Sequence, residues 1–233
     1  MSAVCAHRPR PLRALAALGF ALLLLCFPRM AWACEGAVVV CADAADGSLA
    51  LILNGRALPV VVASDADPAV RDAAGRFAED LGRVGGAAAP VAADVPDDAD
   101  AAIIVGVAGK GGLIDELAAA GKIDLSQVAG RWEAFGQFVV DDPVPGLGRA
   151  LVIAGSDRRG AAFGLYDLSE KIGVSPWHWW ADVPVERRDT LYLTAGARTD
   201  APAVRYRGFF INDEDPALSG WARNRFGGVN AAF

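Results

Sequence analysis

The apolar residues of this chain alternate between short continuous runs and longer stretches in which they recur at helical spacing. The run AAIIVGV (101–107) is typical of a strand that is buried on both faces. EAFGQFVVDD (133–142) and RALVIAG (149–155) predict two more strands, joined by the turn PVPGLG. Strands of this kind separated by helical stretches indicate an α/β fold.

LALIL (49–53) and PVVVA (59–63) are two further strand-like runs, and they flank the tripeptide NGR. Gly55 in this tripeptide adopts positive φ without steric cost, which favours a hairpin turn. We therefore expect the two runs to pair as a hairpin.

The stretch SDADPAVRDAAGRFAEDLGRVGG (64–86) predicts a helix. Asp67 is a candidate N-cap, Pro68 suits the first helical position and Gly85 is a stop signal. The apolar residues that recur at helical spacing, and so predict one buried face, are Val70, Phe77, Leu81 and Val84.

A second helix is predicted over SDRRGAAFGLYDLSEKIGVSP (156–176), with Ser156 or Asp157 as its cap. Arg158 and Arg159 fall in its first turn, where the helix dipole disfavours positive charge. We expect these side chains to pair with a neighbouring carboxylate rather than with a ligand.

The glycine-rich stretch GKGGLIDELAAAG (109–121) directly follows the 101–107 strand and predicts a short helix. Glycine-rich loops at helix N-termini bind phosphates, so a Rossmann-type oxidoreductase is one alternative for the whole chain. The spacing argues against it, because no Ser or Thr follows Gly109 and Lys110, and Ile114 stands where a GxGxxG motif needs its last Gly. A plain strand-to-helix turn is the better interpretation.

Together these elements predict a small mixed-sheet α/β domain over residues 34–200. The stretch TAGARTDAPAV (194–204) is small, polar and interrupted by Pro202, and we interpret it as a linker. A new element is expected to start at Val204.

Residues 1–33 have the pattern of a secretory signal peptide, with arginines at the start, the apolar run ALAALGFALLLLCF, and AWA before Cys34. A retained membrane anchor and lipid attachment at Cys34 are the alternatives. Cleavage predicts a secreted or periplasmic protein without a membrane segment. It removes four arginines, so the 22 basic residues become 18 against 28 acidic ones, a net charge of about −10. This charge argues against nucleic acid or an anionic membrane as a partner.

Two cysteines, Cys34 and Cys41, stay in the chain after cleavage. In an oxidising compartment they can close a small local disulfide, and two free thiols are the alternative. So few ligands do not predict a metal site, and no motif predicts a cofactor.

Two long strings carry a family resemblance. GSDRRGAAFGLYDLSEKIGVSPWHWWADVPV (155–185), followed by VRYRGFFINDEDPALSGWARNRFGGVN (204–230), resembles the N-terminal region of glycoside hydrolase family 115, the xylan α-1,2-glucuronidases. The likeness extends more weakly through AAIIVGVAGKGGLIDELAAAGKID and GRWEAFGQFVV. Two departures are His178, where the family has Tyr, and Ala231 with Ala232, where the family is more polar.

The resemblance implies a small α/β domain followed by a (β/α)8 barrel whose first strand is YRGFFI (206–211) and whose next helix lies in ALSGWARNRFGG (217–228). It implies hydrolytic removal of glucuronic acid or 4-O-methylglucuronic acid from xylan with inversion. Glucuronoxylan oligosaccharide is then the expected partner, and a homodimer an expected full-length assembly. Since a complete barrel needs about 250 residues, residues 201–233 are expected to begin an incomplete barrel, and this fragment to be inactive alone.

A polar cluster follows the predicted barrel strand, where barrel active sites form. We assign Asp213 first, and Glu214 and Asn212 after it, to substrate binding, because carboxylates and amides match the hydroxyl pattern of a sugar. Hydrogen bonds to loop backbone are the alternative. Asp215, directly before Pro216, is expected to cap a helix. Adjacent residues on one loop do not flank a sugar on both faces, and the resemblance places the catalytic acid and base on later strands.

Trp177, Trp179 and Trp180 are interpreted as a contact between domains, with His178 a polar member of that contact and not a metal ligand. Stacking on sugar rings is the alternative. For the chain as a whole, the second hypothesis is a stand-alone carbohydrate-binding or interaction module without catalysis.

Overall fold

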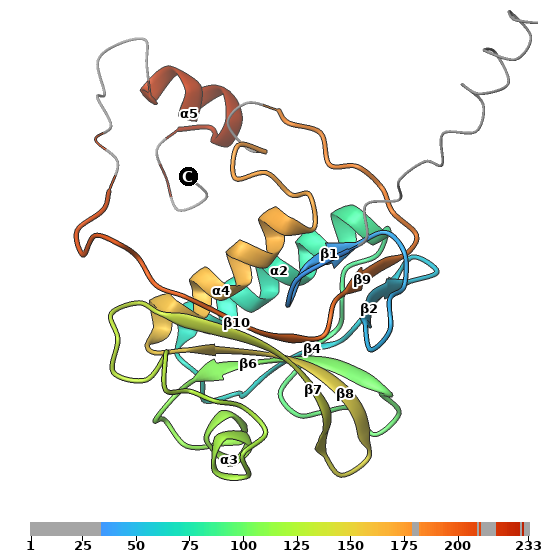
Figure 1. Cartoon of the computed structure of the whole chain (residues 1–233). Coiled ribbons are helices and arrows are strands. Elements are labelled where there is room, and N and C mark those ends of the chain that lie inside the picture. The colour runs from blue at the N-terminus through green and yellow to red at the C-terminus, as the bar shows by residue number, and fades with distance from the viewer. Residues whose placement is uncertain (1–33, 179–181, 209, 211–217, 229, 231–233) are drawn as a thin grey trace, which may run out of the picture. The chain divides into compact units, whose positions relative to one another are not determined.

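The computed structural model describes residues 34–178, 182–208, 210, 218–228 and 230 (Figure 1). Within these residues the strands form two sheets, ordered β10-β7-β8-β6-β4-β5 and β1-β9-β2-β3, here called the large and the small sheet. The strands of the large sheet are β4 (Val60–Val62), β5 (Val91–Ala92), β6 (Ala101–Val107), β7 (Phe135–Val144), β8 (Leu147–Gly155) and β10 (Gly196–Asp200). Those of the small sheet are β1 (Val40–Cys41), β2 (Leu49–Leu53), β3 (Arg56–Ala57) and β9 (Leu191–Leu193). The described helices are α2 (Pro68–Gly85), α3 (Leu113–Ala119), α4 (Arg158–Lys171) and α5 (Leu218–Phe226).

The large sheet is mixed. Strands β5, β4, β6 and β8 run parallel to one another, whereas β7 and β10 are antiparallel to their neighbours. The predicted turn PVPGLG closes the β7–β8 hairpin, in which Val144 lies opposite Leu147. This mixed α/β architecture is the fold class that the sequence predicted.

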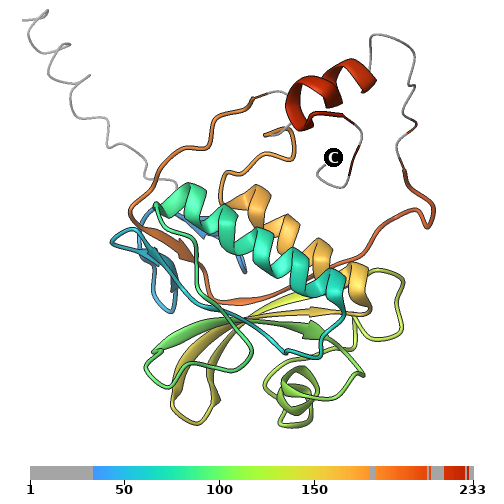
Figure 2. The same cartoon turned by 180° about the vertical axis from the view of Figure 1, so that it is seen from behind.

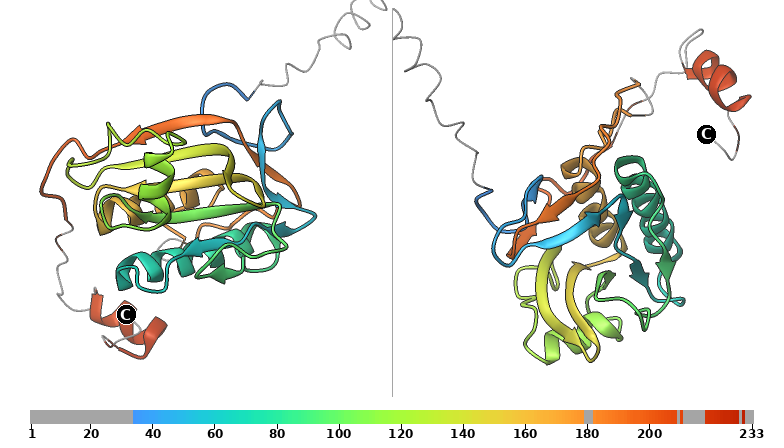
Figure 3. Two further views of the ribbon diagram at one scale, coloured as in Figure 1. Left: turned by 90° about the horizontal axis from the view of Figure 1, so that it is seen from below. Right: turned by 90° about the vertical axis from the view of Figure 1, so that its right-hand side faces the viewer.

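Helices cover both faces of the large sheet. Figures 1 and 2 show α2 and α4 together on one face, and Figure 3 shows α3 on the other. The α2 and α4 face buries Phe77 and Leu165 with Ile103 of the sheet, and the α3 face buries Leu117 with Ile104. Because neighbouring strand residues point to opposite faces, the continuous apolar run of β6 supplies both cores at once.

The two long helices begin where the sequence predicted. The Asp67 side chain accepts from the Ala69 N–H over 2.9 Å and caps α2, with Pro68 in its first turn. Asp157 caps α4 by accepting from the N–H groups of Arg159 and Gly160. These caps satisfy backbone donors that the helices leave open, which is why short polar residues before an apolar period predict helix starts well.

The hairpin prediction at NGR is right about the turn and wrong about the second strand. Asn54 and Gly55 have positive φ of 52° and 73°, and β2 pairs with the short strand β3. The run 59–63 instead supplies β4, which lies between β6 and β5 in the large sheet. All three residues of β4 are buried, and such a strand needs cover on both faces, which an interior position of the large sheet provides.

The linker prediction for 194–204 is wrong in its first half. Residues Gly196–Asp200 form the edge strand β10, which pairs antiparallel with β7 so that Arg198 lies opposite Gln137. The segment has the polar composition of a linker because most of its residues are exposed at the edge of the sheet, where polar residues are usual.

The predicted boundaries at residues 33 and 200 stay predictions. Cys34 and Cys41 are both disulfide-bonded, so the free-thiol alternative is wrong. In the part of the chain that the structure describes, no helix has the length and apolar character needed to cross a membrane.

Candidate functional site

The residues predicted to bind sugar, Asn212, Asp213 and Glu214, lie outside the described residues, as does the predicted cap Asp215. The preceding segment is described through Gly208 and again at Phe210, and none of these positions from 201 onward belongs to a strand. The predicted barrel strand 206–211 therefore stays a prediction. The helix predicted after it is confirmed as α5.

A buried carboxylate lies beside the segment that leads to these residues. The Glu133 side chain is only 2% exposed and is paired with two guanidinium groups. Its Oε1 lies 2.9 Å from Nε of Arg159 in α4, and its Oε2 accepts from Nη2 of Arg207. Glu133 thus joins the first turn of a core helix to the chain just beyond β10.

Aromatic rings complete this contact. The guanidinium of Arg205 lies 4.3 Å from the centre of the Trp132 ring. Those of Arg159 and Arg207 lie 5.6 and 5.4 Å from the centre of Phe163. Cations over aromatic faces are attracted by the ring quadrupole, so the rings add to the ion pairs. We call Trp132, Glu133, Arg159, Phe163, Arg205 and Arg207 the junction cluster.

The loop that carries Glu133 is tied to the start of α4. The Glu133 N–H donates to Asp157 over 3.0 Å, and the Ala134 N–H donates to the hydroxyl of Ser156 over 2.9 Å. A Cβ on Gly160 would lie 2.1 Å from the carbonyl oxygen of Ala134, so only glycine permits this approach. The string GSDRRG therefore serves both to cap α4 and to seat the Glu133 loop.

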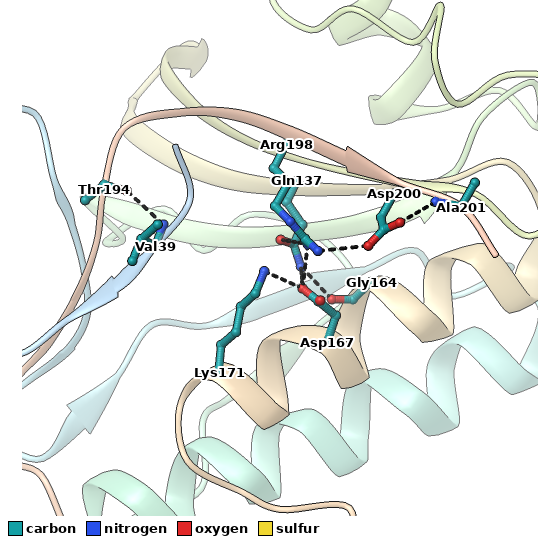
Figure 4. Close-up of polar contacts among 9 residues, drawn as sticks. All are labelled: Val39, Gln137, Gly164, Asp167, Lys171, Thr194, Arg198, Asp200 and Ala201. Atoms are coloured by element: carbon teal, nitrogen blue, oxygen red, sulfur yellow. Dashed lines mark hydrogen bonds and ion pairs between the residues drawn. The ribbon is translucent and has the colours of Figure 1, made fainter. Parts of the chain in front are cut away.

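A second polar network fixes β10 (Figure 4). Gln137 of β7 is fully buried, and its amide donates to the Gly164 carbonyl over 2.9 Å and to Asp167 over 3.0 Å. The same carboxylate of Asp167 accepts from Arg198 over 2.9 Å and from Lys171 over 2.7 Å. Strand β10 is thereby bonded to α4 through side chains as well as to β7 through its backbone.

A cavity of about 980 Å³ opens at the carboxyl ends of the parallel strands β4, β6 and β8. This is the usual position of ligand sites in α/β folds. Its anion-binding positions are, however, taken by the chain itself. Asp67 and Asp157 cap the two helices, and Asp115 accepts from the N–H groups of Gly109 and Gly111 over 2.8 and 2.6 Å. A carboxylate where a phosphate would sit supports the interpretation of 109–112 as a plain turn.

A groove of about 520 Å³ runs between α2 and α4 and mixes aromatic with charged side chains. It includes Phe163 and Tyr166, together with Arg76, Asp80 and the buried Ser169. Burial raises the pKa of the Tyr166 phenol, although the charge of Arg76 opposes this shift. Within the described part of the chain, the Ser169 hydroxyl has no hydrogen-bond partner. An aromatic face next to ionic groups is a surface that suits a polyhydroxy ligand.

Of the tryptophan cluster, Trp177 is 56% exposed, while Trp179 and Trp180 lie outside the described residues. The Nδ1 atom of His178 lies 3.2 Å from the carbonyl oxygen of Val183. Among the described residues, no group of three or more His, Cys, Asp or Glu side chains is placed to hold a metal ion.

Comparison with known proteins decides the family. The family model described as "Glycosyl hydrolase family 115" matches residues 199–233. The solved structure of "A novel family GH115 4-O-Methyl-alpha-glucuronidase, BtGH115A, with specificity for decorated arabinogalactans" aligns with 79% of this chain at 32% identity and a TM-score of 0.64. The chain belongs to glycoside hydrolase family 115. It spans 22% of the length of that family 115 protein.

Two other comparisons add nothing to the family 115 assignment. A solved structure described as "Structure of CpGH84D" aligns with 67% of this chain and 22% of its own, at 14% identity and a TM-score of 0.38. No curated protein matches the sequence.

The sequence prediction missed most residues of the two networks, among them Glu133, Asp167, Arg198 and Arg207. One signal was present, because Gln137 interrupts the apolar run FGQFVV. A polar residue inside a buried strand needs a hydrogen-bond partner, which predicts a polar network on that face of the sheet. The expectation that Arg158 and Arg159 pair with carboxylates is confirmed, since Arg158 lies 3.6 Å from Asp67 and Arg159 pairs with Glu133.

Proposed function

We propose that this chain is part of a secreted or periplasmic glycoside hydrolase that removes glucuronic acid or 4-O-methylglucuronic acid branches from xylan by inverting hydrolysis. The observation that carries the proposal is the structural match, at 32% identity, to a 4-O-methyl-α-glucuronidase of the same family. Its substrate is a glucuronoxylan oligosaccharide. The neighbour's specificity for decorated arabinogalactans is consistent with a branched plant polysaccharide.

In this proposal, Asn212, Asp213 and Glu214 bind the sugar, and the catalytic acid and base are other residues. Sugar hydroxyls both donate and accept hydrogen bonds, whereas the carboxylate of the branch sugar only accepts them. The amide of Asn212 offers a donor to either group, and the carboxylates of Asp213 and Glu214 offer acceptors to the hydroxyls. The α/β domain supports the segment that carries them through β10 and the junction cluster.

The test is release of glucuronic acid by the full-length gene product. Glucuronoxylan oligosaccharide and undecorated xylo-oligosaccharide are compared, and the anomer first released is read by proton NMR. The proposal expects release from the decorated substrate with inverted configuration, and a higher KM in Asp213→Ala. Absence of release, or retained configuration, contradicts it.

The second candidate, a carbohydrate-binding module without catalysis, is favoured by the groove between α2 and α4. It expects the 233-residue chain to bind glucuronoxylan oligosaccharide in calorimetry, with loss of binding in Tyr166→Ala and no product from the full-length protein. Release of glucuronic acid excludes this candidate as the main function.

A further inference from the structure

The chain leaves the α/β domain along a path that is held at several points. Strand β10 ends at Asp200, after its backbone has paired with β7 and Arg198 has paired with Asp167. Arg205 then lies on the Trp132 ring, and Arg207 pairs with Glu133. Residues 201–207 are therefore fixed at both ends, unlike a flexible linker.

Glu133 is the buried group of this path. A buried carboxylate is costly unless it is paired, and this one is paired with two arginines. Arg159 lies in the first turn of α4, where the helix dipole disfavours a cation, and its pairing with Glu133 offsets this. Glu133 itself has a φ of 51°, a conformation that non-glycine residues rarely adopt. The α/β domain thus accepts both a buried charge and an unfavourable backbone conformation at one residue.

Arg159 and Arg207 both pair with Glu133, but the two ion pairs have different roles. Arg159 belongs to the α/β domain, so its ion pair contributes to the fold. Arg207 is 29% exposed at its side chain and belongs to the segment that matches the family model. Removal of Arg207 leaves the Glu133–Arg159 pair in place, so the two roles can be separated by mutation.

We propose that Glu133 is a positioning residue for sugar binding: by holding Arg207 it sets where the segment that continues to Asn212, Asp213 and Glu214 leaves the α/β domain. The inference rests on the proposed function for its effect on the sugar. Its structural half, that residues 201–207 are held through Glu133, stands on the contacts alone.

The structural half is tested by trypsin. Residues 203–208 are exposed, so cleavage after Arg205 is limited by how readily this held segment opens and extends into the protease. In the full-length gene product, Arg207→Met and Glu133→Gln are expected to accelerate this cleavage about tenfold, because local opening controls cleavage. Arg158→Met is the matched control, since it removes an exposed arginine of the same helix turn whose carboxylate, Asp67, keeps its capping bond. Fragments are identified by mass spectrometry.

The functional half is tested by kinetics with glucuronoxylan oligosaccharide. Arg207→Met is expected to raise KM about tenfold with kcat within about twofold, the pattern of weakened ground-state binding. Arg207→Lys, which keeps the charge, is expected to recover part of the loss. A residue with only a structural role would lower the melting temperature without this split between KM and kcat.

The outcomes separate the two claims. Wild-type cleavage rates after Arg205 in Arg207→Met overturn the inference, whatever the substrate. Faster cleavage with unchanged KM overturns its functional half, provided that Asp213→Ala raises KM. If Asp213→Ala also leaves KM unchanged, the assignment of the sugar-binding residues in the proposed function fails instead.

Discussion

Arg198 of β10 donates to Asp167 of α4 over 2.9 Å, and this ion pair joins the edge of the large sheet to the helix that covers it. Asp167 also accepts from the buried amide of Gln137 and from Lys171. One carboxylate therefore satisfies donors from three elements. This ion pair helps to hold Gly196–Asp200, which has the polar composition of a linker, in place as the edge strand β10.

Replacement of Arg198 by Met should lower the free energy of unfolding by about 1–3 kcal/mol, because Asp167 and Gln137 lose a partner in a largely buried network. Urea unfolding followed by circular dichroism measures the change. The control is Arg188→Met, which removes an exposed pair with Glu186 and should change stability by less than about 0.5 kcal/mol. Equal losses in the two variants would contradict the network.

Glycine at position 160 should be irreplaceable. Gly160→Ala places a Cβ 2.1 Å from a backbone oxygen of Ala134, so we expect a loss of about 3 kcal/mol or failure to fold. Gly75→Ala is the matched change in helix α2, with no atom within 4 Å of the new Cβ. It should stabilise the protein by about 0.5–1 kcal/mol through lower backbone entropy in the unfolded chain. Melting temperatures of the two variants should therefore move in opposite directions.

The phenol of Tyr166 should lose its proton at a higher pH than an exposed tyrosine. Burial raises its pKa in the folded protein above the ordinary value of 10.0, so the folded state favours the neutral phenol. This contribution to stability is complete below pH 10 and is lost as the pH rises through the folded pKa, because the unfolded chain releases the proton first. Absorbance at the tyrosinate band against pH measures the titration. In Tyr166→Phe the late component should be absent, and its persistence would assign it to another tyrosine.

NAD should not stabilise the protein. The N–H groups of Gly109 and Gly111 already donate to Asp115, so a pyrophosphate would have to displace a carboxylate. A thermal-shift titration with NAD should leave the melting temperature unchanged. A melting temperature that rises with NAD concentration would reveal specific binding to the folded state and revive the dinucleotide interpretation.

The helices could be predicted because their signals are local. Asp67 with Pro68 and the apolar period that follows specify the start and the buried face of α2 within a few residues. The same holds for Asp157 and α4. The α/β fold class follows from these helices and the continuous apolar run of β6.

Strand partners could not be predicted in the same way. PVVVA is compatible with a hairpin and with an interior parallel strand, and burial of β4 on both faces decided for the latter. GARTD has little β propensity, and its place beside β7 depends on Gln137 and Asp167. Strand pairing is non-local, so the sequence of one strand does not contain the identity of its neighbour.

The candidate site shows the same difference between local signals, which the sequence contains, and contacts between distant segments, which it does not. The sequence by itself determined the family resemblance and the need of Arg158 and Arg159 for carboxylates. Its assignment of Asn212, Asp213 and Glu214 as sugar ligands stays a prediction. Only the tertiary structure showed that Glu133 is buried and pairs with both Arg159 and Arg207, because that contact joins three segments that are distant in the chain. The start and the buried face of a helix are encoded by residues close together in the sequence. A buried charge, in contrast, acquires its partners only when the core is assembled.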